Sequence, residues 1–262
     1  MGYDKNKFLL ADKLLIQWRI IFFFNFAKKK SEVAYQFMAK NKLRRFDENA
    51  TFPNLIQSGI SYPPVDHELK GRWKNTFFGN DNPIVLELGC GRGEYATNLA
   101  KLFPEKNFIG IDWKGARLWR GAKTGIEEKI GNVAFLRIQI QNISSFFSQD
   151  EVDEIWITFP DPQILKTGVK KRLTSPRFLN LYRRFMVKDG VVNLKTDSRF
   201  FYDYTAEVIK EEKLEVLIAT DNLYEKEQDE VLSIKTTYEK MWLKDGARIC
   251  YLRFRINSYE EI

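Results

Sequence analysis

Three glycines follow a short apolar run in the segment Pro83–Tyr95, PIVLELGCGRGEY. The run predicts a buried strand, and a helical pattern begins directly after the third glycine. Gly89, Gly91 and Gly93 at this junction would let the backbone approach a nucleotide-like cofactor closely. A tight strand-to-helix turn without a ligand is the alternative.

Two carboxylates indicate which cofactor this would be. Glu87 lies just before the glycines, and Asp112 ends a second apolar run, Phe108–Ile111. An acid at the tip of the second strand commonly binds a ribose. A carboxylate beside the glycine turn would repel a pyrophosphate, whereas S-adenosyl-L-methionine lacks phosphate and carries a sulfonium and an amino group. Glu87 therefore favours S-adenosyl-L-methionine over NAD, with a capping or solvated carboxylate as the alternative for each acid.

A third acid, Asp161, lies between two prolines in the sequence TFPDPQ, after the apolar run Glu154–Phe159. Proline fixes its own φ and restricts the residue before it. We therefore expect Asp161 in a rigid turn at a strand's carboxyl end, beside the cofactor. A plain loop with an Asx turn is the alternative.

A run of basic residues follows, with the sequence KTGVKKRLTSPR and no acid. Such a run is either a solvated face or a phosphate-binding patch, and its place after the Asp161 turn favours contact with a nucleic acid. Its cations are Lys166, Lys170, Lys171, Arg172 and Arg177. Three residues of an earlier predicted helix are expected to extend the patch, namely Arg117, Arg120 and Lys123.

The elements that must position these residues alternate between strand and helix from Ile84 onward. The alternation predicts an α/β fold, a doubly wound, mostly parallel seven-stranded sheet whose last strand is antiparallel. The expected strands are Ile84–Leu88, Asn107–Ile111, Val133–Ile138, Glu154–Phe159, Val191–Lys195, Leu214–Ala219 and Arg248–Phe254. The expected helices are Glu94–Leu102, Gly115–Lys129, Pro176–Met186 and Phe200–Glu212, and Thr220–Lys244 is a long polar connection.

Composition narrows the class of protein. The chain has 262 residues, a net charge of +7 and a pI of about 9.2, which favours a polyanionic partner. Cys90 and Cys250 lie far apart, so we expect a reducing cytoplasm rather than disulfides or a zinc site. The single histidine, His67, is expected on the surface or in packing, and no metal is expected.

Three regions are predicted along the chain. Residues 1–37 form an extension whose apolar stretch, Leu14–Ala27, is interrupted by polar residues and too short for a membrane span. The extension is either an amphipathic surface helix or not translated, if synthesis starts at Met38. Residues 38–82 are expected to be an irregular basic arm and a packing helix, and residues 83–257 the cofactor-binding domain. Monomer and homodimer both stay open.

In order, the motifs ELGCGRG, IGID, FPDP, KKRLT, LKTD and TTYE resemble those of the bacterial tRNA (guanine-N7)-methyltransferase family. The resemblance spans about Lys70 to Arg255. It implies a Rossmann-like methyltransferase fold with S-adenosyl-L-methionine as the methyl donor. It also implies methyl transfer to N7 of a guanine in the tRNA variable loop, at position 46.

The resemblance also implies roles for individual residues. Glu87, Asp112 and Asp161 match cofactor-binding acids, and Asp161 also matches the active-site residue. Asp197 in LKTD matches a substrate-contacting acid, and Thr167–Arg172 matches the segment that meets RNA. The motif TTYE matches a substrate-contacting patch, which here is Thr236, Thr237, Tyr238 and Glu239.

The chain departs from the family at two places. Gln139 stands where the family commonly has an acid near the adenine, and Gln163 replaces a tryptophan after FPDP. The family's next lysine falls at Leu165, or at Lys166 with a shift of one residue. A methyltransferase of small molecules or proteins and an RNA-binding module without cofactor are the other readings. The basic run argues against the first, and the retained acids and glycines argue against the second.

Overall fold

The computed structural model describes residues 41–57, 65–226 and 230–256. The extension 1–37, with its expected surface helix or start at Met38, lies outside the described residues. The chain divides into two units, Met1–Asp47 and Glu48–Ile262. The described part of the first unit is helical. The predicted domain boundaries stay predictions.

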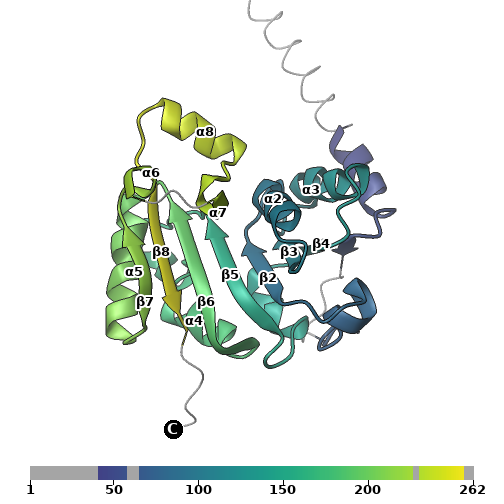
Figure 1. Ribbon diagram of the computed structural model, residues 1–262, viewed down its shortest axis with the longest axis horizontal. Coiled ribbons are helices and arrows are strands. Elements are labelled where there is room, and N and C mark those ends of the chain that lie inside the picture. Colours follow the sequence, from purple (N-terminus) through teal and green to yellow (C-terminus); the bar gives the residue numbers. More distant parts are fainter. Residues whose placement is uncertain (1–40, 58–64, 227–229, 257–262) are drawn as a thin grey trace, which may run out of the picture. The chain divides into compact units, whose positions relative to one another are not determined.

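The second unit is built on one sheet of eight strands (Figure 1). Five strands run parallel in the order β4-β3-β2-β5-β6, and β1 adds a further parallel strand beside β4. β8 pairs antiparallel with both β6 and β7. The strands are β1 Leu55–Gln57, β2 Ile84–Leu88, β3 Asn107–Ile111, β4 Val133–Arg137, β5 Val152–Thr158, β6 Met186–Thr196, β7 Val216–Thr220 and β8 Cys250–Arg255.

The predicted fold class is confirmed, including the antiparallel strand near the end of the chain. The structure adds β1 as an eighth strand to the seven predicted. The expected irregular arm at the start of residues 38–82 is wrong for residues 41–57, since residues 41–49 are helical and β1 follows. A strand of three residues is too short to show a hydrophobic period.

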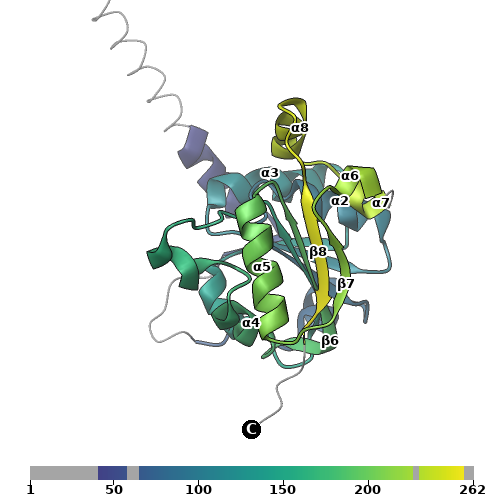
Figure 2. The ribbon, with the colours of Figure 1, turned by 90° about the vertical axis from the view of Figure 1, so that its left-hand side faces the viewer.

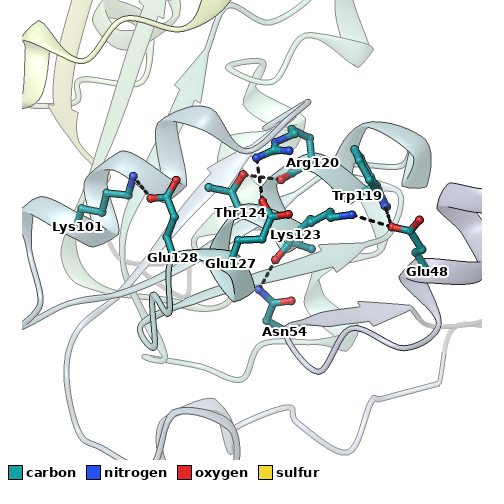
Figure 3. A network of polar contacts seen from close by, with 10 residues as sticks. Glu48, Asn54, Lys101, Trp119, Arg120, Lys123, Thr124, Glu127 and Glu128 are labelled. Carbon is teal, nitrogen blue, oxygen red and sulfur yellow. Dashed lines mark hydrogen bonds and ion pairs between the residues drawn. The ribbon is translucent and has the colours of Figure 1, made fainter.

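Polar contacts with α3, Gly115–Glu127, fix the segment that leads into β1 (Figure 3). Asn54 donates to the carbonyl oxygen of Ala122 at 2.9 Å. Glu48 accepts from the Trp119 indole at 2.8 Å and forms an ion pair with Lys123 at 3.3 Å. The Lys123 ammonium, expected in the basic patch, is therefore engaged within the protein.

Helices cover both faces of the sheet, so its central strands are buried on both sides. Figure 2 shows α5, Arg199–Glu211, lying across one face of the sheet. One core gathers around Trp73 and Phe147 and includes Phe201 of this helix. The other gathers around Tyr95 and Leu118 of α2 and α3. The helical segments are η1 Trp73–Phe78, α2 Glu94–Leu102, α3, η2 Ile140–Ser145, η3 Lys166–Lys171, α4 Pro176–Tyr182, α5 Arg199–Glu211, α6 Leu223–Lys226, α7 Glu230–Ser233 and α8 Thr237–Lys244.

The strand order creates a switch point between β2 and β5. The chain runs from β2 through β3 to β4 on one side, then returns to place β5 and β6 on the other. Open α/β sheets bind ligands outside the carboxyl ends of strands at such a point. In Figure 1 these ends point toward α8. Among the described residues, no helix is both long and apolar enough to cross a membrane.

Candidate active site

The glycine turn between β2 and α2 leaves open space above its backbone. Gly89, Gly91 and Gly93 have φ values of 73°, 56° and 68°, which side chains other than glycine rarely adopt. A Cβ atom at Gly89 or Gly91 would meet no atom within 4 Å, whereas one at Gly93 would lie 2.3 Å from Phe135. The first two glycines therefore leave room for a ligand, and the third lets helix and sheet pack closely.

Asp112 braces this turn from the end of β3. Its two carboxylate oxygens accept hydrogen bonds from the backbone N–H of Gly91 at 3.0 Å and of Lys114 at 2.7 Å. The N–H groups of Gly89 and Cys90 both donate to the carbonyl oxygen of Ile111. The predicted ribose-binding acid thus lies against the predicted cofactor turn.

Glu87 forms the floor of the site and is 3% exposed. Its carboxylate accepts from the Thr158 hydroxyl at 2.6 Å and from the Ala96 N–H at 2.9 Å. Burial raises the pKa of Glu87 to about 7, the hydrogen bonds from Thr158 and Ala96 lower it, and the charges of Asp112 and Glu94 raise it further. Because a buried carboxylate is costly to ionise alone, a cation beside it would favour the charged form.

A pocket of about 120 Å³ opens above Glu87 between the glycine turn and α8. Two predicted cofactor glycines, Gly89 and Gly91, share it with Thr236 of the TTYE motif. Arg117, predicted in the basic patch, also lines it. The remaining lining residues are Cys90, Arg92, Glu94, Thr158, Phe159 and Trp242.

Asp161 lies in a constrained turn beyond the end of β5. Phe159 and Gln163 flank the segment Pro160-Asp161-Pro162 and have φ values of 49° and 47°. Such backbone conformations cost about 1–3 kcal/mol each and persist only when the surroundings fix them. Asp161 is exposed, and one of its oxygens accepts from the Gln163 N–H at 3.0 Å. The Asx turn is therefore present, and the backbone conformation around it is fixed by its surroundings.

The basic run separates into two kinds of cation. Lys166, Lys170 and Lys171 are exposed on η3. Arg172 is 5% exposed, and its guanidinium donates twice to the carbonyl oxygen of Gln163. Arg177, the fifth cation of the run, is also exposed. The structure thus presents four of the five cations to solvent and turns Arg172 inward.

The TTYE motif forms the start of α8. Thr236 and Glu239 make a reciprocal capping box, in which each side chain accepts from the other's backbone N–H. The Thr237 N–H and hydroxyl contact the Glu94 carboxylate at 2.6 and 2.7 Å. The Tyr238 side chain lies outside the described residues. A T-x-x-E spacing is itself a helix-start signature, so the sequence contained a signal for this helix.

A buried ion pair joins α8 to the end of β6. Glu239 and Lys195 are both 0% exposed, and their charged groups lie 2.9 Å apart. Lys195 also donates to the carbonyl oxygens of Leu232 and Ile234, and the Tyr224 hydroxyl donates to Glu239. Burial lowers the pKa of Lys195, and the Glu239 carboxylate opposes this. Glu239, predicted to contact substrate, thus has a buried internal partner.

Asp112 and Asp161 are not among the residues that line this pocket. Two further predicted residues, Gln139 and Asp197, also lie outside it, after β4 and β6. Asp197 is exposed directly after β6. Gln139 is half-buried after β4, and its side-chain oxygen accepts from Gln141 at 2.8 Å. Since the strand order is β4-β3-β2-β5-β6, these residues extend the row of Asp112, Glu87 and Asp161 along one edge of the sheet.

The two cysteines and the histidine form no disulfide or metal site among the described residues. Cys90 and Cys250 are buried free thiols, and the His67 ring stacks on Phe146 at 4.9 Å. Over residues 41–57, 65–226 and 230–256, no three His, Cys, Asp or Glu side chains are grouped so that they could hold a metal ion.

Comparisons with known proteins agree with this geometry. The family model described as "Putative methyltransferase" matches residues 81–252. A tRNA (guanine-N(7)-)-methyltransferase of Christiangramia forsetii is 52% identical, over 83% of this chain and 99% of the relative. A protein of the same name from Bacteroides thetaiotaomicron is 48% identical, over 84% of this chain and 87% of its own. The 16S rRNA methyltransferase KamB shares the fold, with a TM-score of 0.52 at 15% identity, over 67% of this chain and 88% of KamB. The chain therefore belongs to the tRNA (guanine-N(7)-)-methyltransferase family.

Proposed function

We propose that the protein transfers a methyl group from S-adenosyl-L-methionine to N7 of a guanine in the tRNA variable loop, at position 46, and so forms 7-methylguanosine. The observation that supports this proposal is the glycine-turn pocket with Glu87 at its floor, whose lining includes Phe159, two residues before Asp161. The names of the relatives supply the type of reaction and the class of RNA.

The buried carboxylate of Glu87 and the open space above Gly89 and Gly91 support S-adenosyl-L-methionine as the cofactor. The cofactor supplies an electrophilic methyl group on a sulfonium. Glu87 would bind the cationic amino group of the cofactor. The open space above Gly89 and Gly91 would let the cofactor lie against the backbone of the turn. Asp112 would bind the ribose hydroxyls, and Gln139 would hydrogen-bond the adenine.

Methylation of guanine N7 requires no proton transfer by the protein before the attack. Guanine N7 carries a free lone pair at neutral pH, so no general base is needed. Alignment of N7 with the methyl carbon and the sulfur is the main requirement. The purine becomes cationic on methylation, and the Asp161 carboxylate would stabilise that charge and orient the base. Asp197, at the neighbouring strand end, would share either task.

The tRNA would be held by the exposed lysines of η3. Lys166, Lys170 and Lys171 would bind phosphates next to the target guanine. The guanine would have to leave its stack to enter the pocket, as in other base-modifying enzymes. Of the motif TTYE, Thr236 lines the pocket, and we assign it substrate contact, with Thr237 beside it.

Labelled methyl transfer to unmodified tRNA tests this proposal. Cleavage chemistry specific for 7-methylguanine should then cut the product within the variable loop. A tRNA with adenine at the target position should accept no label there. Incorporation of label elsewhere in the tRNA, or none at all, would contradict the proposed function.

A further inference from the structure

We propose that Arg172 is a positioning residue for the Asp161 turn and not a phosphate ligand of the tRNA. The inference rests on the proposed function, because it assumes that Asp161 acts on the bound guanine. Arg172 follows three exposed lysines within the basic run KTGVKKRLTSPR. Arg172 itself is 5% exposed, so its guanidinium is not accessible to the phosphates of an RNA.

The Arg172 guanidinium is occupied by the protein. Its Nε and one Nη donate to the carbonyl oxygen of Gln163 at 3.3 and 3.1 Å. Its centre lies 4.2 Å from the centroid of the Tyr204 ring and 4.8 Å from that of Phe200. Phe200 and Tyr204 are four residues apart on α5 and therefore lie on one face of that helix. Arg172 thus ties the loop after β5 to α5.

The point of attachment is close to the proposed active-site acid. Gln163 is two residues after Asp161, and its N–H donates to the Asp161 carboxylate at 3.0 Å. Its backbone has the unfavourable φ of 47°, which persists only where the surroundings fix it. Arg172 holds the carbonyl of this residue while Asp161 accepts from its N–H. Releasing Arg172 would therefore let the turn relax and move Asp161.

The residues after Arg172 fasten the same segment further. The hydroxyls of Thr174 and Thr205 lie 2.7 Å apart in the interior. The Tyr182 hydroxyl donates to the carbonyl oxygen of Leu173 at 2.9 Å. The sequence KRLT is therefore a docking element that anchors the loop to α4 and α5, and Arg172 is the member that reaches the Asp161 turn.

An arginine meets this task and a lysine does not. Its planar guanidinium can donate twice to one acceptor while stacking on aromatic rings. Lysine keeps the positive charge but offers neither the fork nor the plane. Arg172→Lys therefore separates the geometry of the side chain from its charge. Tyr204→Leu provides a second variant, because it removes one of the stacked rings without changing the charge.

The test measures single-turnover methyl transfer at saturating tRNA and cofactor, and tRNA affinity at several salt concentrations. We expect Arg172→Lys and Tyr204→Leu to slow transfer by about 10- to 100-fold, as displacement of a reacting group by about 1 Å can do. Their salt dependence of tRNA binding should equal that of the wild type. Lys171→Gln should instead weaken tRNA binding and reduce the salt slope by about 1. Lys188→Met, at an exposed lysine near the start of β6, is the control and should change neither.

Wild-type rates in Arg172→Lys and Tyr204→Leu would overturn the inference. A reduced salt slope in Arg172→Met, equal to that of Lys171→Gln, would also overturn it, since Arg172 would then be a phosphate ligand. Thermal stabilisation by S-adenosylhomocysteine shows that each variant retains a folded cofactor pocket. Failure of the wild type to methylate tRNA would contradict the proposed function itself and is seen before any variant is compared.

Discussion

Two carboxylates of the candidate site differ in environment, and this difference separates the roles that we propose for them. Glu87 is buried at the carboxyl end of β2 and shares both oxygens with protein donors. Asp161 is exposed, and one of its oxygens accepts a hydrogen bond from the Gln163 N–H within its own turn. A buried acid suits a fixed cation, whereas an exposed one can meet a base that arrives from solution. Both environments follow from the strand ends on which the acids lie.

Asp161→Asn tests the charge of the exposed acid while keeping its turn. The asparagine side-chain oxygen can still accept from the Gln163 N–H, so the backbone should be preserved. We expect methyl transfer to slow by about 100-fold or more, because stabilisation of the cationic product is lost. The tRNA affinity should be largely retained. The measurement is single-turnover transfer with a parallel binding titration, and full activity in this variant would rule out the proposed role.

Glu87→Gln tests the pKa of the buried acid through protein stability. The pKa of Glu87 is about 7 in the fold against an ordinary 4.5, so the folded state binds its proton more tightly than the unfolded state. Wild-type stability should therefore fall as the pH rises from about 4.5 through 7. Fully ionising Glu87 should cost about 3 kcal/mol, and glutamine, which does not titrate, avoids this loss.

Denaturant unfolding of both proteins without cofactor, at pH 5 and pH 8, measures the effect. Glu87→Gln should gain stability relative to the wild type as the pH rises. Parallel pH profiles for the two proteins would show that Glu87 does not titrate in this range. The same variant should bind S-adenosyl-L-methionine more weakly, because the counter-charge for the cationic amino group is gone.

At the scale of the elements, α8 shows how a short helix is held over a pocket. Its capping box satisfies the first backbone N–H groups, and Thr237 contacts Glu94 at the pocket rim. The Trp242 ring packs against Phe159 at a centroid distance of 5.0 Å. Beneath it, Lys195 and Glu239 link the helix to β6. These contacts fix the wall of the pocket that faces the glycine turn.

The losses of stability on removing the two members of the buried pair should be less than additive. Lys195→Met leaves the Glu239 carboxylate buried without its cation, and breaking such a pair costs about 3–5 kcal/mol. Glu239→Gln leaves the Lys195 ammonium with only its carbonyl acceptors. In Lys195→Met with Glu239→Gln neither charge is left unpaired, so its unfolding free energy should fall by less than the sum of the single changes.

Denaturant unfolding of the three variants gives this coupling. Lys101→Gln, which removes the partner of Glu128 in an exposed ion pair, is the matched control and should change stability little. Additive losses in the double variant would mean that Lys195 and Glu239 act independently.

The elements themselves differ in how far the sequence could predict them. The strands β2 and β3 and the helix α2 match the predicted boundaries, because their apolar runs and glycine punctuation are strong local signals. The burial of Arg172 could not be predicted from KTGVKKRLT, since it depends on Phe200 and Tyr204 of a later helix. The pairing of Glu239 with Lys195 likewise joins residues 44 positions apart.

At the scale of the whole molecule, the site is a consequence of strand order. Glu87, Asp112, Gln139, Asp161 and Asp197 span more than one hundred residues of sequence, yet their strands are consecutive neighbours in the sheet. Parallel strands bring all their carboxyl ends to one edge. The sequence predicted this gathering because each residue lies near the end of an apolar run or shortly after it. The order β4-β3-β2-β5-β6 itself depends on tertiary packing, which no single run encodes.

Ligand binding to this edge should stabilise the whole domain, which allows a test of cofactor identity. A ligand that binds only the folded state adds about 2.7 kcal/mol of stability at 100 times its dissociation constant. S-adenosylhomocysteine should therefore raise the melting temperature in a concentration-dependent way, since it keeps the amino acid end and the ribose. NAD should give no comparable shift, because its pyrophosphate would lie against the Glu87 carboxylate. Glu87→Gln is the matched variant and should shrink the shift with S-adenosylhomocysteine. Equal stabilisation of the wild type by both ligands would mean that Glu87 does not select the cofactor.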